Sequence, residues 1–170
     1  KESATRWSAA AVRLRSRFAQ DFIDPVSGSI ADHLDARDVP NGQVRPNALF
    51  SLQLLDRPED AARVTRQAWT ALVYPWGVAT LDQRDPDFHP YHVAPGHYHK
   101  DAAYHNGAVW PWLNGIAMQR MIELGQPDLA WQLFANMNEI ALTRGVVGGL
   151  PANLDAYPHP GESAPRLTGP

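Results

Sequence analysis

The sequence contains no cysteine. Disulfide frameworks, thiolate metal sites and cysteine nucleophiles are therefore excluded, and cysteine usage leaves the redox compartment open. Long apolar runs are also missing, since none approaches the roughly 18 residues that a membrane-spanning helix needs. Lysine is scarce, with only Lys1 and Lys100, and the arginines are scattered along the chain. Without a basic stripe or an apolar span, the sequence predicts neither a nucleic-acid-binding protein nor a membrane protein.

What the chain does have is the composition of a folded domain. Its 170 residues are 44% hydrophobic and 19% charged, with a formal net charge of −3. This provides apolar material for a core and too little charge for intrinsic disorder. We expect a single segment over residues 1–170, with a loop-rich tail at 148–170. The sequence begins at Lys1 without an initiator methionine, which leads us to expect a piece of a longer protein.

Helical periodicity dominates the chain. Apolar residues recur at three- and four-residue spacing between Ser3, the expected N-cap of the first helix, and Phe22. Further helices are expected at residues 46–55, 58–72, 107–124 and 127–144. Alternation over residues 29–35 predicts one short strand. The pattern as a whole predicts an all-α array, whose apolar faces need either further chain or another subunit as neighbours.

Most of the Trp, Tyr and His residues fall between positions 74 and 112. Four prolines in the first part of this window predict an ordered but irregular loop. Five histidines there raise the possibility of a metal site: His89, His92, His97, His99 and His105. Their spacing matches no strong metal-binding pattern, so hydrogen-bonded or solvated loop histidines are the simpler interpretation, and we expect no metal and no cofactor. Rings combined with neutral donors also suit sugar hydroxyls.

An Asn-Gly turn and an early helical proline mark the end of this window as a loop in front of a helix. Such a loop would project three polar or aromatic side chains, namely Tyr104, His105 and Asn106. Two tryptophans follow directly. Trp110 and Trp112 either fill the core beneath the loop or divide the roles, with Trp112 buried and Trp110 lining a cleft.

Three ordered blocks of the sequence point to a known family. The first is Val-Arg-Pro-Asn-Ala-Leu-Phe at 44–50. The second joins Gly-Val-Ala-Thr-Leu at 77–81 to Asp-Pro at 85–86, Pro-Tyr at 90–91, Tyr-His-Asn-Gly at 104–107 and Val-Trp-Pro-Trp at 109–112. The third comprises Leu-Asp-Ala at 154–156, Gly-Glu at 161–162 and Pro-Arg-Leu-Thr-Gly at 165–169. Over about residues 8–170 the chain resembles the C-terminal part of the glucosidase domain of glycogen debranching enzymes, the amylo-α-1,6-glucosidase type.

This resemblance implies the C-terminal portion of an (α/α)6 toroid of the six-hairpin glycosidase type. It also implies a cytoplasmic, inverting glycoside hydrolase that acts on α-glucan or a related glycoside. Substrate binding would then involve Arg45, Asn47, Tyr104, His105, Asn106 and Trp110. The implied partners are an oligosaccharide or polysaccharide substrate and the rest of the toroid or another subunit. Arg45 has a second interpretation, in which it forms an ion pair with Asp32 or Asp35 and holds its loop.

Two positions depart from the pattern of the family. Ala152 stands where the family has the glutamate that activates water, and Ala79 stands where it commonly has arginine. Asp155 is the substitute base that the sequence offers, but a turn aspartate that bonds its own backbone is the favoured interpretation of this residue; Glu162 is a more distant candidate. The general acid would lie outside this chain, so we expect weak or no activity from the chain alone. The alternative function is a non-catalytic carbohydrate-binding or regulatory module of the same fold.

Overall fold

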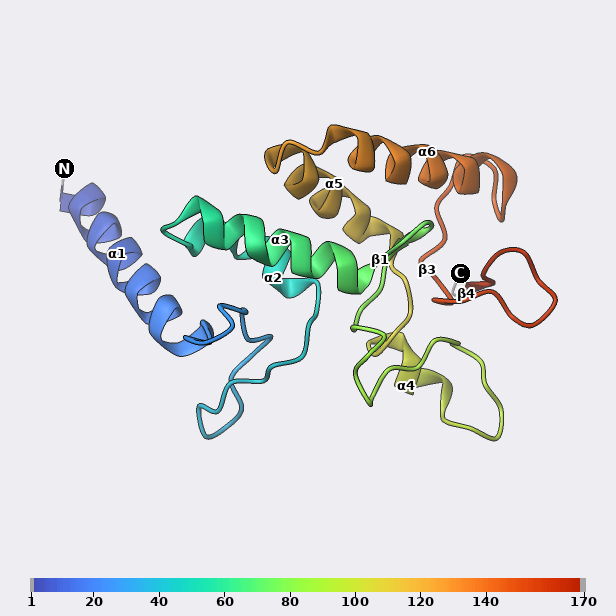
Figure 1. The fold of residues 1–170 in the computed structure, drawn as a ribbon, viewed down its shortest axis with the longest axis horizontal. Helices are drawn as coiled ribbons and strands as arrows, with labels where there is room; N and C mark the ends of the chain where they lie inside the picture. The colour runs from blue at the N-terminus through green and yellow to red at the C-terminus, as the bar shows by residue number, and fades with distance from the viewer. Residues whose placement is uncertain (1, 169–170) are drawn as a thin grey trace.

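The computed structural model describes residues 2–168 as a mostly helical chain with two small sheets (Figure 1). The α-helices are α1 (Glu2–Phe22), α2 (Asn47–Phe50), α3 (Pro58–Leu72), α4 (Lys100–Tyr104), α5 (Asn114–Glu123) and α6 (Pro127–Thr143). The 3-10 helices are η1 (Leu52–Leu54) and η2 (Pro111–Leu113). Strand β1 (Val73–Tyr74) pairs antiparallel with β2 (Gly77–Val78), and β3 (Asn153–Leu154) pairs antiparallel with β4 (Leu167–Thr168). The small sheets correct the all-α expectation. Gly169, which ends the third sequence block, lies outside the described residues.

Helices α3 and α6 begin at the predicted residues because both starts are encoded locally. Pro58 and Pro127 occupy the first helical turn, where a missing N–H costs nothing. Acidic residues follow in each first turn and favour the positive end of the helix dipole. In α3 the acidic residue Asp60 is itself buried and forms ion pairs with Arg57 and Arg63, both at 2.7 Å.

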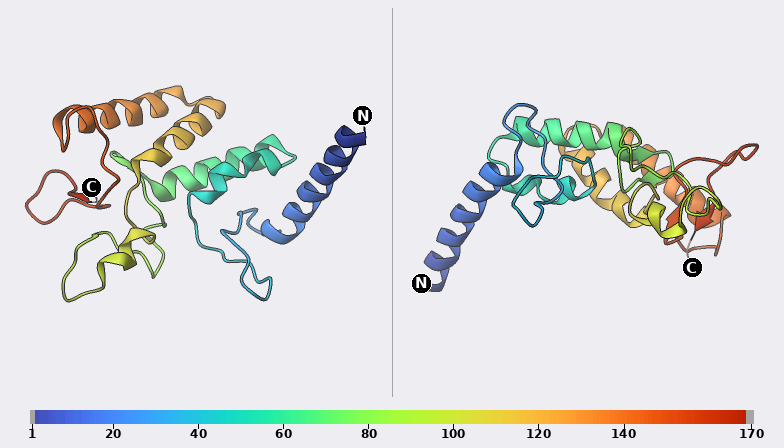
Figure 2. Two further views of the ribbon diagram at one scale, coloured as in Figure 1. Left: turned by 180° about the vertical axis from the view of Figure 1, so that it is seen from behind. Right: turned by 90° about the horizontal axis from the view of Figure 1, so that it is seen from below.

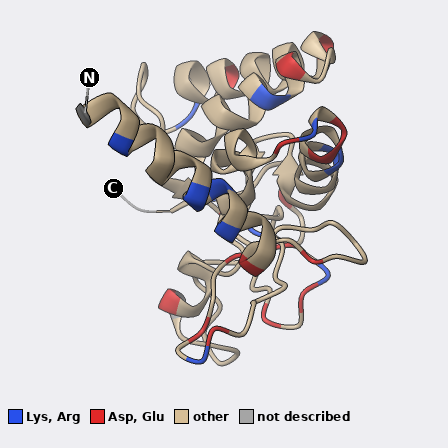
Figure 3. Cartoon of the chain, turned by 90° about the vertical axis from the view of Figure 1, so that its left-hand side faces the viewer, with Lys and Arg blue, Asp and Glu red and all other residues tan. Residues whose placement is uncertain are grey.

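Helix α1 confirms the first predicted helix but not its expected packing. It begins at Glu2, so Ser3 lies within the helix and is not its N-cap. In Figure 1 it extends away from the other helices, and basic positions recur along it in Figure 3. Phe18 is buried, whereas Trp7 and Leu14 of the same apolar stripe are 68% and 56% exposed. Arg15 attaches the helix to η1 by donating to the Gln53 carbonyl at 2.6 Å.

Several other predicted elements need correction, including the helix expected at 46–55, which is divided into α2 and η1. The strand expected at 29–35 is reduced to isolated bridges, in which Ile30 pairs with Ile23 and Leu34 pairs with Pro40. The helix expected from residue 107 begins later, as η2 followed by α5, because residues 107–110 are used in bridges and turns. Helix α4 lies inside the window that was predicted to be a loop.

A ladder of short backbone pairings connects segments that are far apart in the sequence. After the β1–β2 hairpin, Ala79 pairs with Val109, and Val109 pairs in turn with Leu154 of β3. These three residues are fully buried and form a core cluster with Ala156 and with Ile140 of α6. The ladder therefore fixes residues 77–80, 107–110 and 153–155 side by side.

The helices and the long loops occupy different sides of the molecule. In Figures 1 and 2, α3, α5 and α6 lie together, while the loops around residues 24–45 and 80–108 extend from the same side of them. The main core lies between α2, α3 and α5, with Leu49, Leu72 and Leu113 almost completely buried. Among residues 2–168, no helix combines the length and apolar composition that crossing a bilayer requires. The loop side is where the predicted binding residues meet.

Candidate functional site

The site is built where three loops are joined by hydrogen bonds. The Gly107 N–H donates to the Thr80 hydroxyl at 2.9 Å, and the Thr80 N–H donates to the Ala108 carbonyl at 3.1 Å. The Asp82 N–H donates to the Val44 carbonyl at 3.1 Å. The first and second blocks of the sequence resemblance are therefore in direct contact.

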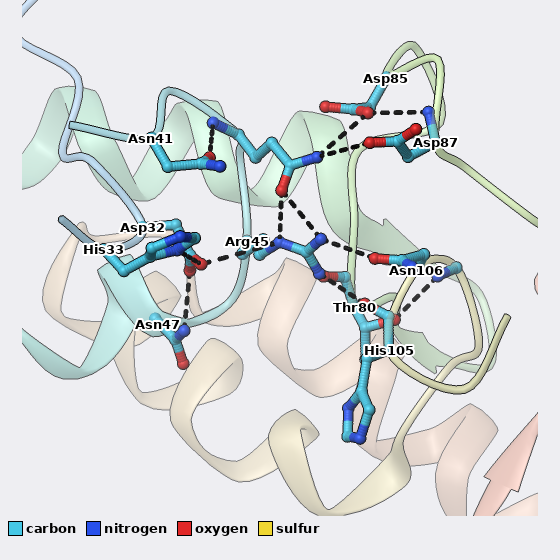
Figure 4. Close-up of polar contacts among 12 residues, drawn as sticks. Asp32, His33, Asn41, Arg45, Asn47, Thr80, Asp85, Asp87, His105 and Asn106 are labelled. Carbon is cyan, nitrogen blue, oxygen red and sulfur yellow. Dashed lines mark hydrogen bonds and ion pairs between the residues drawn. The ribbon is translucent and has the colours of Figure 1, made fainter. Parts of the chain in front are cut away.

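Arg45 lies at the centre of this junction (Figure 4). Its Nε and Nη2 donate to Oε1 of Gln43 at 3.0 and 2.9 Å. Nη1 donates to the carbonyls of Thr80 at 3.2 Å and His105 at 2.5 Å, and Nη2 also donates to Oδ1 of Asn106 at 2.6 Å. These are five hydrogen bonds, which equals the number of N–H donors that a guanidinium has.

Asp32 is the acidic partner of this arginine. One of its carboxylate oxygens lies 3.7 Å from Nε of Arg45, and the other accepts a hydrogen bond of 2.7 Å from Nδ2 of Asn47. The Asp32 side chain is 9% exposed. Asp35, the other expected partner, instead contacts Arg37. The interpretation of Arg45 as a loop-holding residue paired with Asp32 therefore matches the geometry.

A pocket of about 200 Å³ opens beside Arg45. Its walls are Arg45, Pro46, Asn47, Thr80, His105, Trp110, Trp112 and Leu113. In Figure 4 the Asn47 amide and the His105 ring project to the same side of the Arg45 network. The structure thus brings four of the predicted binding residues to one pocket: Arg45, Asn47, His105 and Trp110.

Trp110 lines the pocket, as one interpretation of the sequence expected, but Trp112 is not the core residue that both interpretations made it. Trp112 is 61% exposed and lines the same pocket. Trp110 is half-buried and packs against the main core as well as lining the pocket. The reason is local, because Pro111 is the first residue of η2 and Trp110 is its N-cap. The tight turn directs Trp112 outward, where its ring centroid lies 6.1 Å from that of Phe50.

Tyr104 and Asn106 lie behind the pocket rather than among its lining residues. The Tyr104 ring is 4.9 Å from the rings of both His105 and Trp110, and its carbonyl accepts a hydrogen bond of 3.0 Å from the Trp110 indole. The Asn106 amide is used on both sides, accepting from Arg45 and donating to the Ala102 carbonyl at 3.0 Å. Both residues support the side chains that face the pocket.

Asp155 is buried in a separate cluster near the C-terminal end of the ladder. Its side chain is 2% exposed. Oδ1 accepts a hydrogen bond of 2.7 Å from the His92 backbone N–H, and Oδ2 lies 2.8 Å from Nε2 of His159. A general base must reach the proton that it removes. The carboxylate instead joins the 88–92 loop to the 155–160 loop, across 63 residues of sequence.

The other residues considered for the base lie on the surface. Ala152 is exposed and has no proton-accepting side chain. Glu162 is bound by Arg166 at 2.6 Å, and this hydrogen bond holds the pKa of the Glu162 carboxyl below its usual value. A carboxylate with a lowered pKa is a weaker base, whereas an efficient general base has a pKa near the working pH. The hydrogen bond from Arg166 therefore makes Glu162 less suited to activate water.

Three of the five loop histidines have different environments. The His89 ring stacks on Tyr98 at 4.2 Å, His99 accepts the backbone N–H of Asp101, and His105 faces the pocket. In the described part of the chain, no group of three or more His, Cys, Asp or Glu side chains is arranged to hold a metal ion. His89 thus takes part in ring packing and His99 in hydrogen bonding.

Sequence reasoning missed Gln43, which gives Arg45 two of its hydrogen bonds. The Gln43 amide also donates to Asp85 and Asp87, both at 3.4 Å. Gln43 directly precedes the first block, and nothing in the sequence around it distinguishes this glutamine from a surface residue. Its position two residues before Arg45, on the same extended segment, is the only local signal, because such residues share one face.

Comparison of the sequence with known protein families gives a match. Residues 1–151 match a family model described as amylo-alpha-1,6-glucosidase. The match begins before residue 8 and ends before the third block, so it covers every residue that lines the pocket but not Asp155, His159 or Glu162. A search of curated proteins gives no match.

Proposed function

Because the chain belongs to the amylo-alpha-1,6-glucosidase family, we propose that the pocket beside Arg45 binds a glucosyl unit of an α-glucan. The observation that carries this proposal is the lining itself. Two indoles stand beside the polar side chains of Asn47 and His105. Ligand pockets combine apolar and aromatic walls with a few placed polar groups, and a sugar ring presents apolar C–H faces together with hydroxyls.

We further propose that the chain forms part of an (α/α)6 toroid. In support, α5 and α6 form a helix hairpin, as that architecture requires. Apolar side chains remain exposed on α1 and on the outer face of this hairpin, among them Trp7, Trp131 and Ile122, at 68%, 68% and 58%. Further helices of the toroid would cover these faces.

Hydrolysis of the glycosidic bond requires more than this pocket. An inverting glycosidase uses two carboxyl groups about 6.5–9.5 Å apart, one to protonate the leaving oxygen and one to activate water. Among the described residues that line the pocket there is no Asp or Glu. We therefore propose that this chain binds the sugar and that the acid and base come from elsewhere in the complete toroid, so that the chain alone has little or no hydrolytic activity.

The absence of a carboxylate from the described pocket lining also favours the second candidate function, a carbohydrate-binding or regulatory module without catalysis. The two functions differ in one measurable respect. An enzyme would release glucose once the remaining toroid is supplied, whereas a binding module would retain glucan affinity without turnover.

Replacing Trp112 with alanine tests the pocket. We expect about a tenfold weaker affinity for maltotriose, because loss of one aromatic platform costs on the order of 1 kcal/mol. Isothermal titration calorimetry measures the affinity. The matched control is Trp131→Ala, since Trp131 is a tryptophan of similar exposure on the α5–α6 face, outside the pocket. The sugar would lie elsewhere if Trp112→Ala and the unchanged chain had equal affinities for maltotriose. The same would follow if only Trp131→Ala lost affinity.

A further inference from the structure

Arg45 lines the pocket, yet its hydrogen-bonding capacity is already used within the protein. Its side chain is 17% exposed. The five donors of its guanidinium meet acceptors on Gln43, Thr80, His105 and Asn106, at distances of 2.5 to 3.2 Å. A sugar hydroxyl could accept a hydrogen bond from Arg45 only by displacing one of these acceptors, which would then lose its bond to the guanidinium.

The acceptors belong to the segments that form the pocket walls. The bond to the His105 carbonyl fixes the backbone from which the His105 side chain projects, and the bond to Asn106 fixes the next residue. Planar guanidinium geometry allows one side chain to hold several carbonyls at defined angles, which the single ammonium of lysine cannot do. Arg45 therefore determines where the His105 ring stands.

Asp32 has the corresponding effect on Asn47. A carboxylate can only accept hydrogen bonds, so it must face the NH2 group of the Asn47 amide, at 2.7 Å. The amide carbonyl of Asn47 is then turned away from Asp32 and is available to a ligand. The 3.7 Å ion pair between Asp32 and Arg45 joins the two halves of this arrangement.

We propose that Arg45 and Asp32 are positioning residues that place His105 and Asn47 for sugar binding and do not themselves contact the sugar. This inference deepens the proposed function and rests on it. The pair makes the pocket present a hydrogen-bond acceptor at one defined position, because the oriented Asn47 carbonyl accepts a hydrogen bond from a sugar hydroxyl. Specificity for a hydroxyl at that point follows from Asp32, which acts on the ligand through Asn47 alone.

The test uses Arg45→Lys and Asp32→Asn, with NMR of the His105 imidazole and the Asn47 side-chain amide in ligand-free protein. We expect Arg45→Lys to shift the His105 signals and Asp32→Asn to shift the Asn47 signals before any sugar is added. The control is Arg84→Lys, since Arg84 binds Asp82 at 2.7 Å from a 71% exposed position outside the pocket. The same spectra report whether each variant is folded. If Arg45→Lys does not fold, Asp32→Asn still provides the test, because asparagine preserves the side-chain volume of aspartate.

Affinity for maltotriose and for its monodeoxy analogues separates positioning from direct contact. A positioning role predicts that Arg45→Lys weakens binding of maltotriose about tenfold, and that this penalty disappears only for the monodeoxy analogue that also abolishes the penalty of His105→Ala. If the penalty disappears for a different analogue, Arg45 contacts that hydroxyl and the inference is wrong. Unchanged His105 signals would also overturn it. If the unchanged protein binds no maltotriose, the proposed function is wrong. The ligand-free spectra still show in that case whether Arg45 and Asp32 place the side chains of His105 and Asn47.

Discussion

Replacing Gly107 with alanine should destabilise the folded chain by about 3–5 kcal/mol, the sum of a strained backbone and a steric overlap. Gly107 has φ of 148°, a conformation that residues with a side chain rarely adopt. A Cβ at this position would also overlap the backbone carbonyl of His89. The His89 segment cannot withdraw easily, because its N–H donates to the Asn106 carbonyl at 2.6 Å.

Urea unfolding of Gly107→Ala measures this loss. The control is Gly96→Ala, where φ is 84° but no heavy atom lies within 4 Å of the added Cβ. That variant carries the backbone strain alone and should lose about 1 kcal/mol. Equal losses at the two positions would mean that the close approach of the 89 and 107 segments does not exist in solution.

Replacing Asp155 with alanine should cost about 3 kcal/mol or more of folding free energy. Hydrogen bonds to a charged group contribute about 1.5–3 kcal/mol each, and Asp155 accepts from the His92 N–H and lies 2.8 Å from His159. Alanine would leave the His92 N–H without its acceptor. It would also detach the 88–92 loop from the C-terminal segment, which thermal unfolding and amide hydrogen exchange can both detect.

Asp155→Asn distinguishes this structural role from catalysis. Asparagine keeps the size and one acceptor oxygen, so we expect a loss of only about 1 kcal/mol. In a complete toroid with measurable glucosidase activity, a structural Asp155 predicts that Asp155→Asn retains most of kcat. A loss of several orders of magnitude in kcat with unchanged stability would instead identify Asp155 as the base that activates water.

The sequence predicted those elements whose signals are local. Helices α3 and α6 were found because proline and acidic residues mark their starts. The strand expected at 29–35 failed for the opposite reason. An alternating pattern predicts which face each side chain lies on, but it does not show that a partner strand is present. Ile30 and Leu34 each form only a single-residue bridge.

The candidate site shows the same division. The resemblance blocks identified Asn47, His105 and Trp110, which all line the pocket. The pairing of Arg45 with Asp32 was one of two open alternatives, because sequence separation does not reveal which loops touch. The bridges from Ala79 to Val109 to Leu154 could not be predicted at all, since each is a single-residue pairing across dozens of positions.

Trp112 illustrates why burial could not be read from helical spacing. Its place in an apolar run predicted a core residue, yet the turn of η2 intervenes between Trp110 and α5. A 3-10 turn advances the chain by three residues per turn instead of 3.6, so the phase of the following side chains changes. The exposed indole that results is central to the proposed sugar site.

The most direct test of the account is a crystal structure of the chain soaked with maltotriose. We predict a glucosyl ring against Trp112, with a hydroxyl donating to the Asn47 carbonyl, His105 within hydrogen-bonding distance, and the Arg45 hydrogen bonds unchanged. A sugar bound on the α5–α6 face around Trp131 while the pocket beside Arg45 stays free would contradict the proposed site.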